Sequence, residues 1–149
     1  MAPGVTPNYL TPYAMHPTAL ELHSEDFITI WFHPTTKTLE MEWLDYVSSY
    51  KFRPILDLGL QLAVENNARH WLANRIQMRS LGEADQEWLT QTWLPKFVAS
   101  GIRKMAVVED SRSLHRVFED QELQGPNGKQ AEIKCFPTRV LALQWIDED

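Results

Sequence analysis

The sequence predicts an α/β fold with a single mixed sheet whose strands are largely parallel. Three patterns indicate it: strand-like and helix-like segments alternate along the chain, residues 38–43 alternate apolar with polar side chains, and an antiparallel hairpin precedes the alternation. Strands separated by helices pair in parallel through right-handed crossovers that place the helices against the sheet. The expected order is ββαβαβαβα, with strands at residues 27–32, 38–43, 70–73, 102–108 and 131–136 and helices at 49–66, at 80–100, from 110 or 111 past 118, and at 137–146.

The opening hairpin is expected to have one apolar and one polar face. Residues 27–32 are β-branched and aromatic, which suits a pleated strand, and residues 34–37 form the turn. In the second strand, a period of two indicates an antiparallel strand that is covered on one side only. The apolar face of this strand carries Leu39, Met41 and Trp43, and its polar face carries Thr38, Glu40 and Glu42.

A proline sets the expected start of the first helix. Apolar residues from Phe52 to Val64 recur near helical spacing. Pro54 lacks the N–H that an interior helical position donates, so we expect the regular helix to begin near Arg53. A looser turn from Ser49 would precede it.

Capping signals mark both ends of the second helix. Ser80 opens an S-x-x-E pattern that closes at Glu83, which is the signature of a capping box. Gly101 is well placed to end the helix, because glycine readily adopts the left-handed conformation found there. Pro95 lies inside the helix and is expected to kink it.

Composition narrows the functional classes. The chain has 149 residues, 44% of them hydrophobic, which suits one domain and excludes a disordered chain. Its 14 basic and 20 acidic residues give a net charge of −6, which argues against nucleic acid or an anionic membrane as a partner. A single cysteine, Cys135, excludes an internal disulfide. No membrane span or signal peptide is apparent, so we expect a cytoplasmic protein.

The first 26 residues differ from the rest of the chain in being rich in proline. We predict that residues 1–26 form an extended, proline-rich arm and that residues 27–149 form the domain. The arm is either a loose terminus or a segment that docks on its own domain or on a second copy. Its prolines, which break helices and cannot donate to a sheet, are Pro3, Pro7, Pro12 and Pro17.

Several short sequence segments carry a resemblance to a known family. They are residues 71–75 (WLANR), 85–89 (DQEWL), 93–95 (WLP), 101–108 (GIRKMAVV) and 142–146 (ALQWI). Together with the order of elements, they resemble the STAS-like family of bacterial proteins, which includes the anti-sigma-factor antagonists and shares its broad fold with CRAL-TRIO lipid-binding domains. The likeness covers about residues 27–146. It implies a STAS-like domain that acts by binding partners rather than by catalysis.

The resemblance also implies a switch. Anti-sigma-factor antagonists carry a phosphorylatable serine between a central strand and the next helix, and Ser80 lies in the matching place. Arg79 stands where the family has aspartate. A phosphate on Ser80 would meet free N–H groups at a helix N-terminus, with Arg75 and Arg79 available to pair with it and Asn74 close by. The alternative is that Ser80 is simply the helix cap.

The carboxyl ends of the parallel strands are the expected place for a ligand or partner. In open α/β sheets, ligands bind beyond these ends. The alternative is that the polar residues there only cap helices or line solvated loops. These residues are Asn74, Arg75, Glu109, Asp110, Ser111 and Thr138.

Aromatic residues of the second helix are candidates for an interface or a pocket. Trp88 and Trp93 are five residues apart, so their directions differ by roughly 140° at ~100° per residue. One of the two indoles would pack on the sheet while the other faces a helix, the arm or a partner. Phe97 is the third interface or pocket candidate on this helix. The alternative is that both indoles belong to the core.

The sequence therefore predicts a non-catalytic interaction or regulatory module, with a protein or a second copy as partner. The alternative is a carrier that holds a small apolar or lipid-like ligand between helices and sheet. A cavity lined by Trp88, Trp93, Phe97 and Phe118 would favour the carrier, whereas a solid core with an exposed aromatic patch would favour the module. No cofactor or metal site is expected, because the five histidines lack metal-ligand spacing and no glycine-rich phosphate loop occurs.

Overall fold

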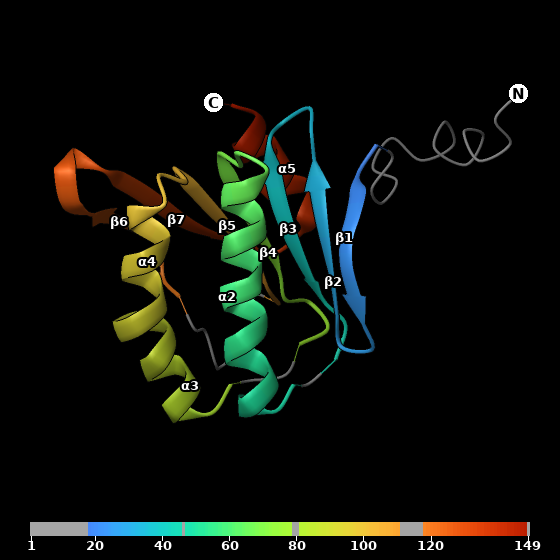
Figure 1. The fold of residues 1–149 in the computed structure, drawn as a ribbon. Coiled ribbons are helices and arrows are strands. Elements are labelled where there is room, and N and C mark those ends of the chain that lie inside the picture. Colours follow the sequence, from blue (N-terminus) through green and yellow to red (C-terminus); the bar gives the residue numbers. More distant parts are fainter. Residues whose placement is uncertain (1–17, 46, 79–80, 111–117, 149) are drawn as a thin grey trace, which may run out of the picture.

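The described residues form one mixed α/β sheet with helices on both faces, as a computed structural model shows (Figure 1). They comprise residues 18–45, 47–78, 81–110 and 118–148. Within them the sheet has seven strands in the order β1-β2-β3-β4-β5-β7-β6. The strands are β1 (Leu20–Glu25), β2 (Ile28–His33), β3 (Thr38–Trp43), β4 (His70–Asn74), β5 (Lys104–Val108), β6 (Gln121–Gln124) and β7 (Gln130–Phe136).

The centre of the sheet is parallel and its two edges are antiparallel. Strands β3, β4, β5 and β7 run in parallel. Strands β1 and β2 precede them as an antiparallel meander, and β6 pairs antiparallel with β7 at the other edge. The α/β class and the single mixed sheet are therefore confirmed.

Strand β1 corrects two expectations. Residues 20–25 form a strand, so an arm cannot extend to residue 26, and the sheet opens with three antiparallel strands rather than with a two-stranded hairpin. Sequence periodicity missed β1 because an edge strand buries little: none of its residues is fully buried. Residues 1–17 of the predicted arm lie outside the described residues.

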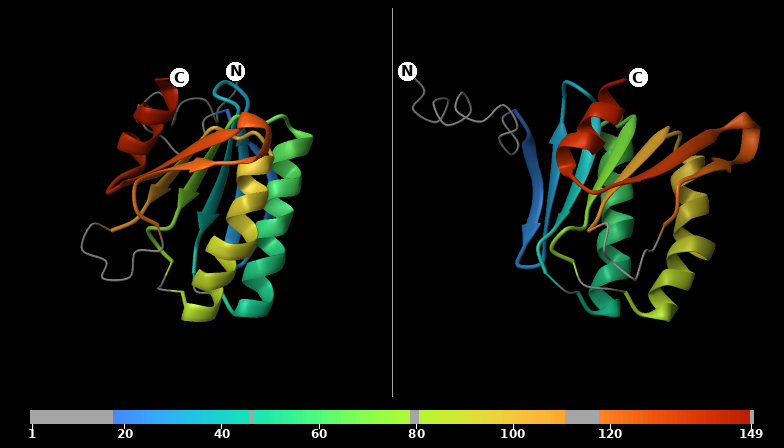
Figure 2. Two further views of the ribbon diagram at one scale, coloured as in Figure 1. Left: turned by 90° about the vertical axis from the view of Figure 1, so that its left-hand side faces the viewer. Right: turned by 180° about the vertical axis from the view of Figure 1, so that it is seen from behind.

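The helices form two layers around the sheet (Figure 2). On one face lie α2 (Ser49–Glu65) and a helical segment that joins α3 (Glu83–Trp88), a π-helix (Leu89–Trp93) and α4 (Leu94–Ala99). On the opposite face lies α5 (Arg139–Asp147), which contacts β4, β5 and β7. The helix predicted from residue 110 or 111 falls largely on residues 111–117, which lie outside the described part.

Helix α2 begins earlier than expected. It starts at Ser49, and the N–H groups of Lys51 and Phe52 already donate to the Ser48 carbonyl at 3.0 and 2.9 Å. Pro54 is accommodated because it removes only the bond to the carbonyl of Tyr50, and Tyr50 is 75% exposed, so water can replace that bond.

The second helical segment also departs from its predicted boundaries. Gly82 is the N-cap and α3 begins at Glu83, so the helix begins later than predicted; Ser80, on which the predicted capping box depends, lies outside the described residues. In place of a simple kink, a π-helical turn ends at Trp93, two residues before Pro95. The wider turn accommodates a residue that has no N–H and whose ring crowds the preceding turn.

An aromatic cluster fills the space between this segment and the sheet. Trp71 of β4 meets Trp93 at a centroid distance of 5.2 Å and Phe97 at 5.9 Å, both edge to face. Trp93 and Phe97 stack at 5.4 Å. The Trp93 indole N–H donates to the Leu56 carbonyl of α2 at 3.1 Å, which satisfies this buried polar group. Trp93 and Phe97, two of the interface or pocket candidates, are therefore buried in the core.

Gly59 allows α2 to approach the sheet closely. A Cβ atom at this position would lie 2.9 Å from the Met41 sulfur and 3.0 Å from a ring carbon of Trp71. Both neighbours are almost completely buried, so neither can move without disturbing the core.

We expect Gly59→Ala to destabilise the fold by about 1–3 kcal/mol, because the added methyl group overpacks the core. Urea unfolding followed by tryptophan fluorescence measures the change. The control is Val64→Ala on the exposed side of the same helix, which should shift stability by less than about 0.5 kcal/mol. Equal stability of Gly59→Ala and the control would contradict the close packing described here.

Candidate functional site

The carboxyl ends of β4 and β5 are joined by a buried ion pair. Arg75 donates through Nη1 to the Glu109 carboxylate at 2.7 Å, and the two side chains are only 8% and 5% exposed. Burial lowers the pKa of Arg75 below its usual range, and the charge of Glu109 opposes that change. The guanidinium still carries its charge at neutral pH. Arg75 is thus held inside the domain by Glu109, away from the exposed position that a phosphate partner requires.

The loop that follows β4 is a defined turn. The Ile76 N–H donates to the Asn74 side-chain oxygen at 3.4 Å, and the Met78 N–H donates to the Arg75 carbonyl at 3.0 Å. Ile76, 48% exposed, is presented on this turn. The two remaining predicted switch residues, Arg79 and Ser80, lie outside the described residues.

Buried contacts also join the N-terminal ends of α2 and α3. Asp85 is 4% exposed and accepts hydrogen bonds from Ser49 Oγ at 2.6 Å and Arg53 Nε at 3.0 Å. The Arg53 guanidinium lies 5.5 Å from the centre of the Trp88 ring, which is half-buried against Phe52. Trp88 is therefore neither a core residue like Trp93 nor a fully exposed one.

A small apolar cavity lies between the helices and the carboxyl ends of the strands. Its volume is about 30 Å³. Trp93 and Phe118, two of the four residues expected around a carrier cavity, line it; Trp88 and Phe97 do not. The full lining is Trp43, Phe52, Leu56, Trp71, Ala73, Arg75, Met78, Leu81, Leu89, Trp93, Met105 and Phe118.

Thr138 caps a helix, which is the alternative to ligand binding that the sequence left open for the polar residues at these strand ends. Its side chain accepts a hydrogen bond from the Leu141 N–H at 3.2 Å and so caps α5. Of the other candidates, Asn74 shapes a turn and Arg75 and Glu109 pair with each other, whereas Ser111 lies outside the described residues.

The opposite face of the sheet holds a buried charge cluster that sequence analysis missed. Glu40 is fully buried, although we expected it on a solvated face. Arg139 of α5 binds it with two hydrogen bonds, Nη2 to Oε1 at 2.8 Å and Nε to Oε2 at 3.0 Å, and His33 Nε2 lies 2.8 Å from Oε1. The expectation failed because Arg139 follows 99 residues later, which no local period can reveal.

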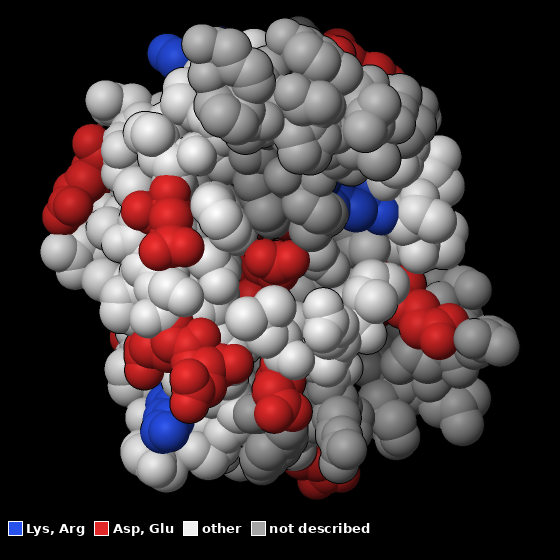
Figure 3. Space-filling view, turned by 90° about the vertical axis from the view of Figure 1, so that its right-hand side faces the viewer, with Lys and Arg blue, Asp and Glu red and all other residues white. Residues whose placement is uncertain are grey.

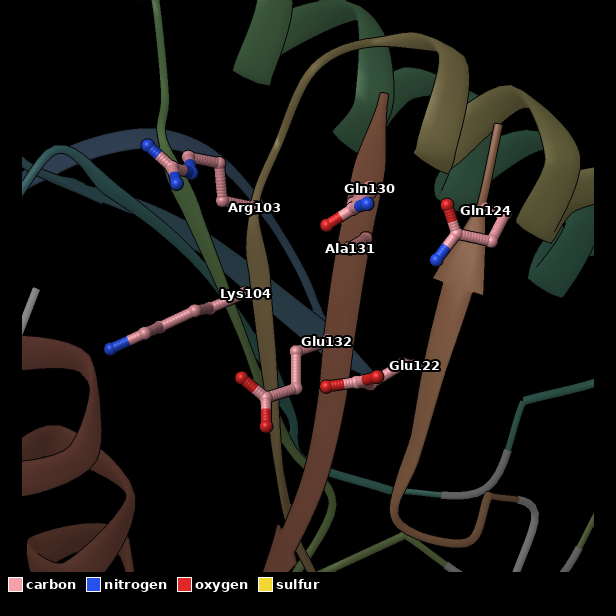
Figure 4. Close-up of a pocket in the computed structure, with 7 residues that line it drawn as sticks. All are labelled: Arg103, Lys104, Glu122, Gln124, Gln130, Ala131 and Glu132. Atoms are coloured by element: carbon pink, nitrogen blue, oxygen red, sulfur yellow. The ribbon is translucent and has the colours of Figure 1, made fainter. Parts of the chain in front are cut away.

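A polar groove lies on the same face, at the edge formed by β5, β7 and β6 (Figure 4). Its volume is about 240 Å³. Side chains from all three strands surround it, and the Glu122 and Glu132 carboxylates lie next to each other in the view. The lining residues are Arg103, Lys104, Glu122, Gln124, Gln130, Ala131 and Glu132. Sequence analysis missed this groove because it did not predict β6.

The comparisons with known proteins assign the chain to no family. No protein-family model matches it, and neither a curated protein nor a solved structure does so. Among the described residues, no helix is both long and apolar enough to cross a membrane. The same part of the chain contains no group of three or more His, Cys, Asp or Glu side chains placed to hold a metal ion.

We expect Arg139→Met to destabilise the fold by about 3–5 kcal/mol, because it leaves the Glu40 carboxylate buried without its bidentate partner. The double variant Glu40→Gln with Arg139→Met should recover much of that loss, since it removes the buried charge as well. Urea unfolding of the two variants and the parent measures both effects. Arg69→Met, an exposed arginine, is the matched control. A loss no larger than that of the control would refute the bridge.

Proposed function

We propose that the protein is a non-catalytic interaction or regulatory module of the STAS-like type, which binds a partner protein in the cytoplasm through the loops at the carboxyl ends of its parallel strands. The observation that carries the proposal is the turn after β4. It exposes an apolar side chain, Ile76, directly after Arg75, which its buried pair with Glu109 holds in place. Functional residues are often found on such loops above a rigid scaffold.

A second exposed side chain lies at the same end of the sheet as the turn after β4. Tyr50 is 75% exposed at the start of α2, next to a groove of about 260 Å³ whose apolar lining includes Phe27, Ile55 and Leu58. Lys51 lies 5.9 Å from the Tyr50 ring centre and 5.6 Å from that of Phe27. Tyrosine is favoured at interfaces because it combines a large apolar ring with a polar tip.

A second copy paired through the sheet edges is the less favoured partner. Strand β1 contains a register shift between Glu21 and His23, and β6 has only four residues. Acidic side chains gather on the side of the molecule that includes β1, where few basic ones are seen (Figure 3). Bulges, charges and short length are the features by which proteins prevent edge-to-edge pairing.

The size of the apolar cavity disfavours the carrier alternative. Pockets for small molecules usually measure ~300–1,000 Å³, whereas this cavity of about 30 Å³ has room for a single water molecule. A lipid-like ligand would require α2 to separate from α3 and α4, which would break the contacts of Asp85 with Ser49 and Arg53.

The proposal predicts that a photo-crosslinking amino acid at position 76 captures a discrete protein partner in the native cell. The control places the same amino acid at Val64, which is 56% exposed near the C-terminal end of α2. A single adduct specific to position 76 supports the proposal. Identical adducts at both positions, or none at position 76, would refute it.

Native mass spectrometry of the purified protein separates the alternatives. The module is expected to carry no small molecule. A retained apolar molecule would establish the carrier instead, and a dimer that persists on dilution would make a second copy the partner.

A further inference from the structure

The groove beside Tyr50 lies between the edge strand β1 and the first half of α2, and its volume is about 260 Å³. Phe27 and Ile55 are buried beneath it, whereas Tyr50 and Pro54 are exposed at its rim. An aromatic-lined groove of this kind suits an extended segment of polypeptide. The lining residues are His23, Glu25, Phe27, Tyr50, Lys51, Pro54, Ile55 and Leu58.

The charges that line the groove are balanced. Among the described lining residues, Glu25 and Lys51 are the one carboxylate and the one ammonium. Glu25 Oε2 lies 2.7 Å from His23 Nε2, and the Lys51 ammonium lies 5.6 Å from the centre of the Phe27 ring, within the range of a cation–π contact. A charged occupant would find no net opposite charge here, so an uncharged segment fits the groove better.

The N-terminal segment of this chain, residues 1–17, has the matching composition. It contains no Asp, Glu, Lys or Arg side chain, and it has four prolines. Proline-rich sequences favour the extended polyproline II conformation, which binds aromatic-lined grooves with little loss of entropy. The large apolar side chains of the segment include Tyr9, Leu10 and Tyr13.

The length of the tether brings these residues to the groove. Strand β1 runs from Leu20 to Glu25 and forms one wall of the groove, so a segment that turns back before β1 runs alongside it. The seven steps from residue 18 to Glu25 span about 23 Å at ~3.3 Å each, a distance that a polyproline II chain covers in about seven or eight residues at ~3.1 Å each. Residues 9–13 therefore reach the level of the groove.

We propose that residues 9–13 of the N-terminal segment bind in this groove of their own domain, with their apolar side chains against Phe27, Ile55 and Tyr50. The tether favours the chain's own domain over a second copy, because a short linker gives a local concentration in the millimolar range. The inference goes beyond the partner binding proposed above and rests on it in one respect: the docked segment covers Tyr50 and competes with a partner that binds there.

Paramagnetic NMR tests the docking in the full chain. A nitroxide is attached at Thr11→Cys in a Cys135→Ser background, which removes the one native cysteine. We expect the backbone amides of Lys51 and Leu58 to lose most of their intensity relative to the reduced, diamagnetic label. The amides of α5, on the opposite face of the sheet, should keep theirs.

Variants of the segment show whether its apolar side chains hold it in the groove. Tyr9→Ser combined with Tyr13→Ser should restore most of the lost intensity. Val5→Ser, an apolar-to-serine change in the same segment but outside residues 9–13, is the matched control and should restore none. No loss at Lys51 and Leu58, or a loss that the double variant leaves unchanged, would overturn the proposal.

An equimolar mixture separates the chain's own segment from that of a second copy. It combines chains that carry the nitroxide but no isotope label with isotope-labelled chains that carry no nitroxide. We expect no loss of intensity in this mixture. A loss as large as in the singly labelled sample would show that a second copy supplies the segment, which contradicts docking on its own domain.

Photo-crosslinking at position 76 distinguishes this inference from the proposed function. Tyr9→Ser with Tyr13→Ser should raise the yield of the partner adduct, because the variant uncovers Tyr50; an unchanged yield would overturn the competition. An adduct at position 76 without loss of intensity in the groove would overturn the docked segment and leave partner binding in place. Loss of intensity without any adduct would do the reverse.

Discussion

The whole structure depends on the need of parallel strands to be covered on both faces. Four adjacent parallel strands form the centre of the sheet, and each face has its own helical layer: α2 with α3 and α4 on one side and α5 on the other. The first layer is held by the aromatic cluster around Trp71 and by Gly59, which lets α2 come close. The second is held by a smaller apolar cluster and by the bridge between Arg139 and Glu40.

The bridge explains why Glu40 can be charged inside the protein. A buried carboxylate is costly unless its oxygens are hydrogen-bonded, and here each oxygen accepts from the guanidinium while His33 contacts one of them. A well-packed apolar pair would give comparable stability, so the bridge matters more for geometry than for energy. It places the N-terminal end of α5 against β3, which is separated from β7 by β4 and β5.

The sequence predicted the elements with strong internal patterns and missed those defined by distant contacts. Residues 38–43, which alternate apolar with polar side chains, lie within β3, and the apolar run at residues 70–73 lies within β4. Strands β1 and β6 escaped notice because edge strands are mostly exposed. At the candidate site, Asn74 and Arg75 were placed correctly at a strand end, but the partners of Arg75 and Glu40 depend on tertiary contacts that no spacing encodes.

Native-state hydrogen exchange tests the two-sided sheet most directly. If α5 closes the second face as an integral layer, the amides of α5 should exchange with the same opening free energy as those of β3 and β4 and should lose protection together with them as urea is added. Amides of α5 that exchange at the rate of a frayed terminus, while the sheet stays protected, would show that the second face is open in solution and that Glu40 does not depend on Arg139.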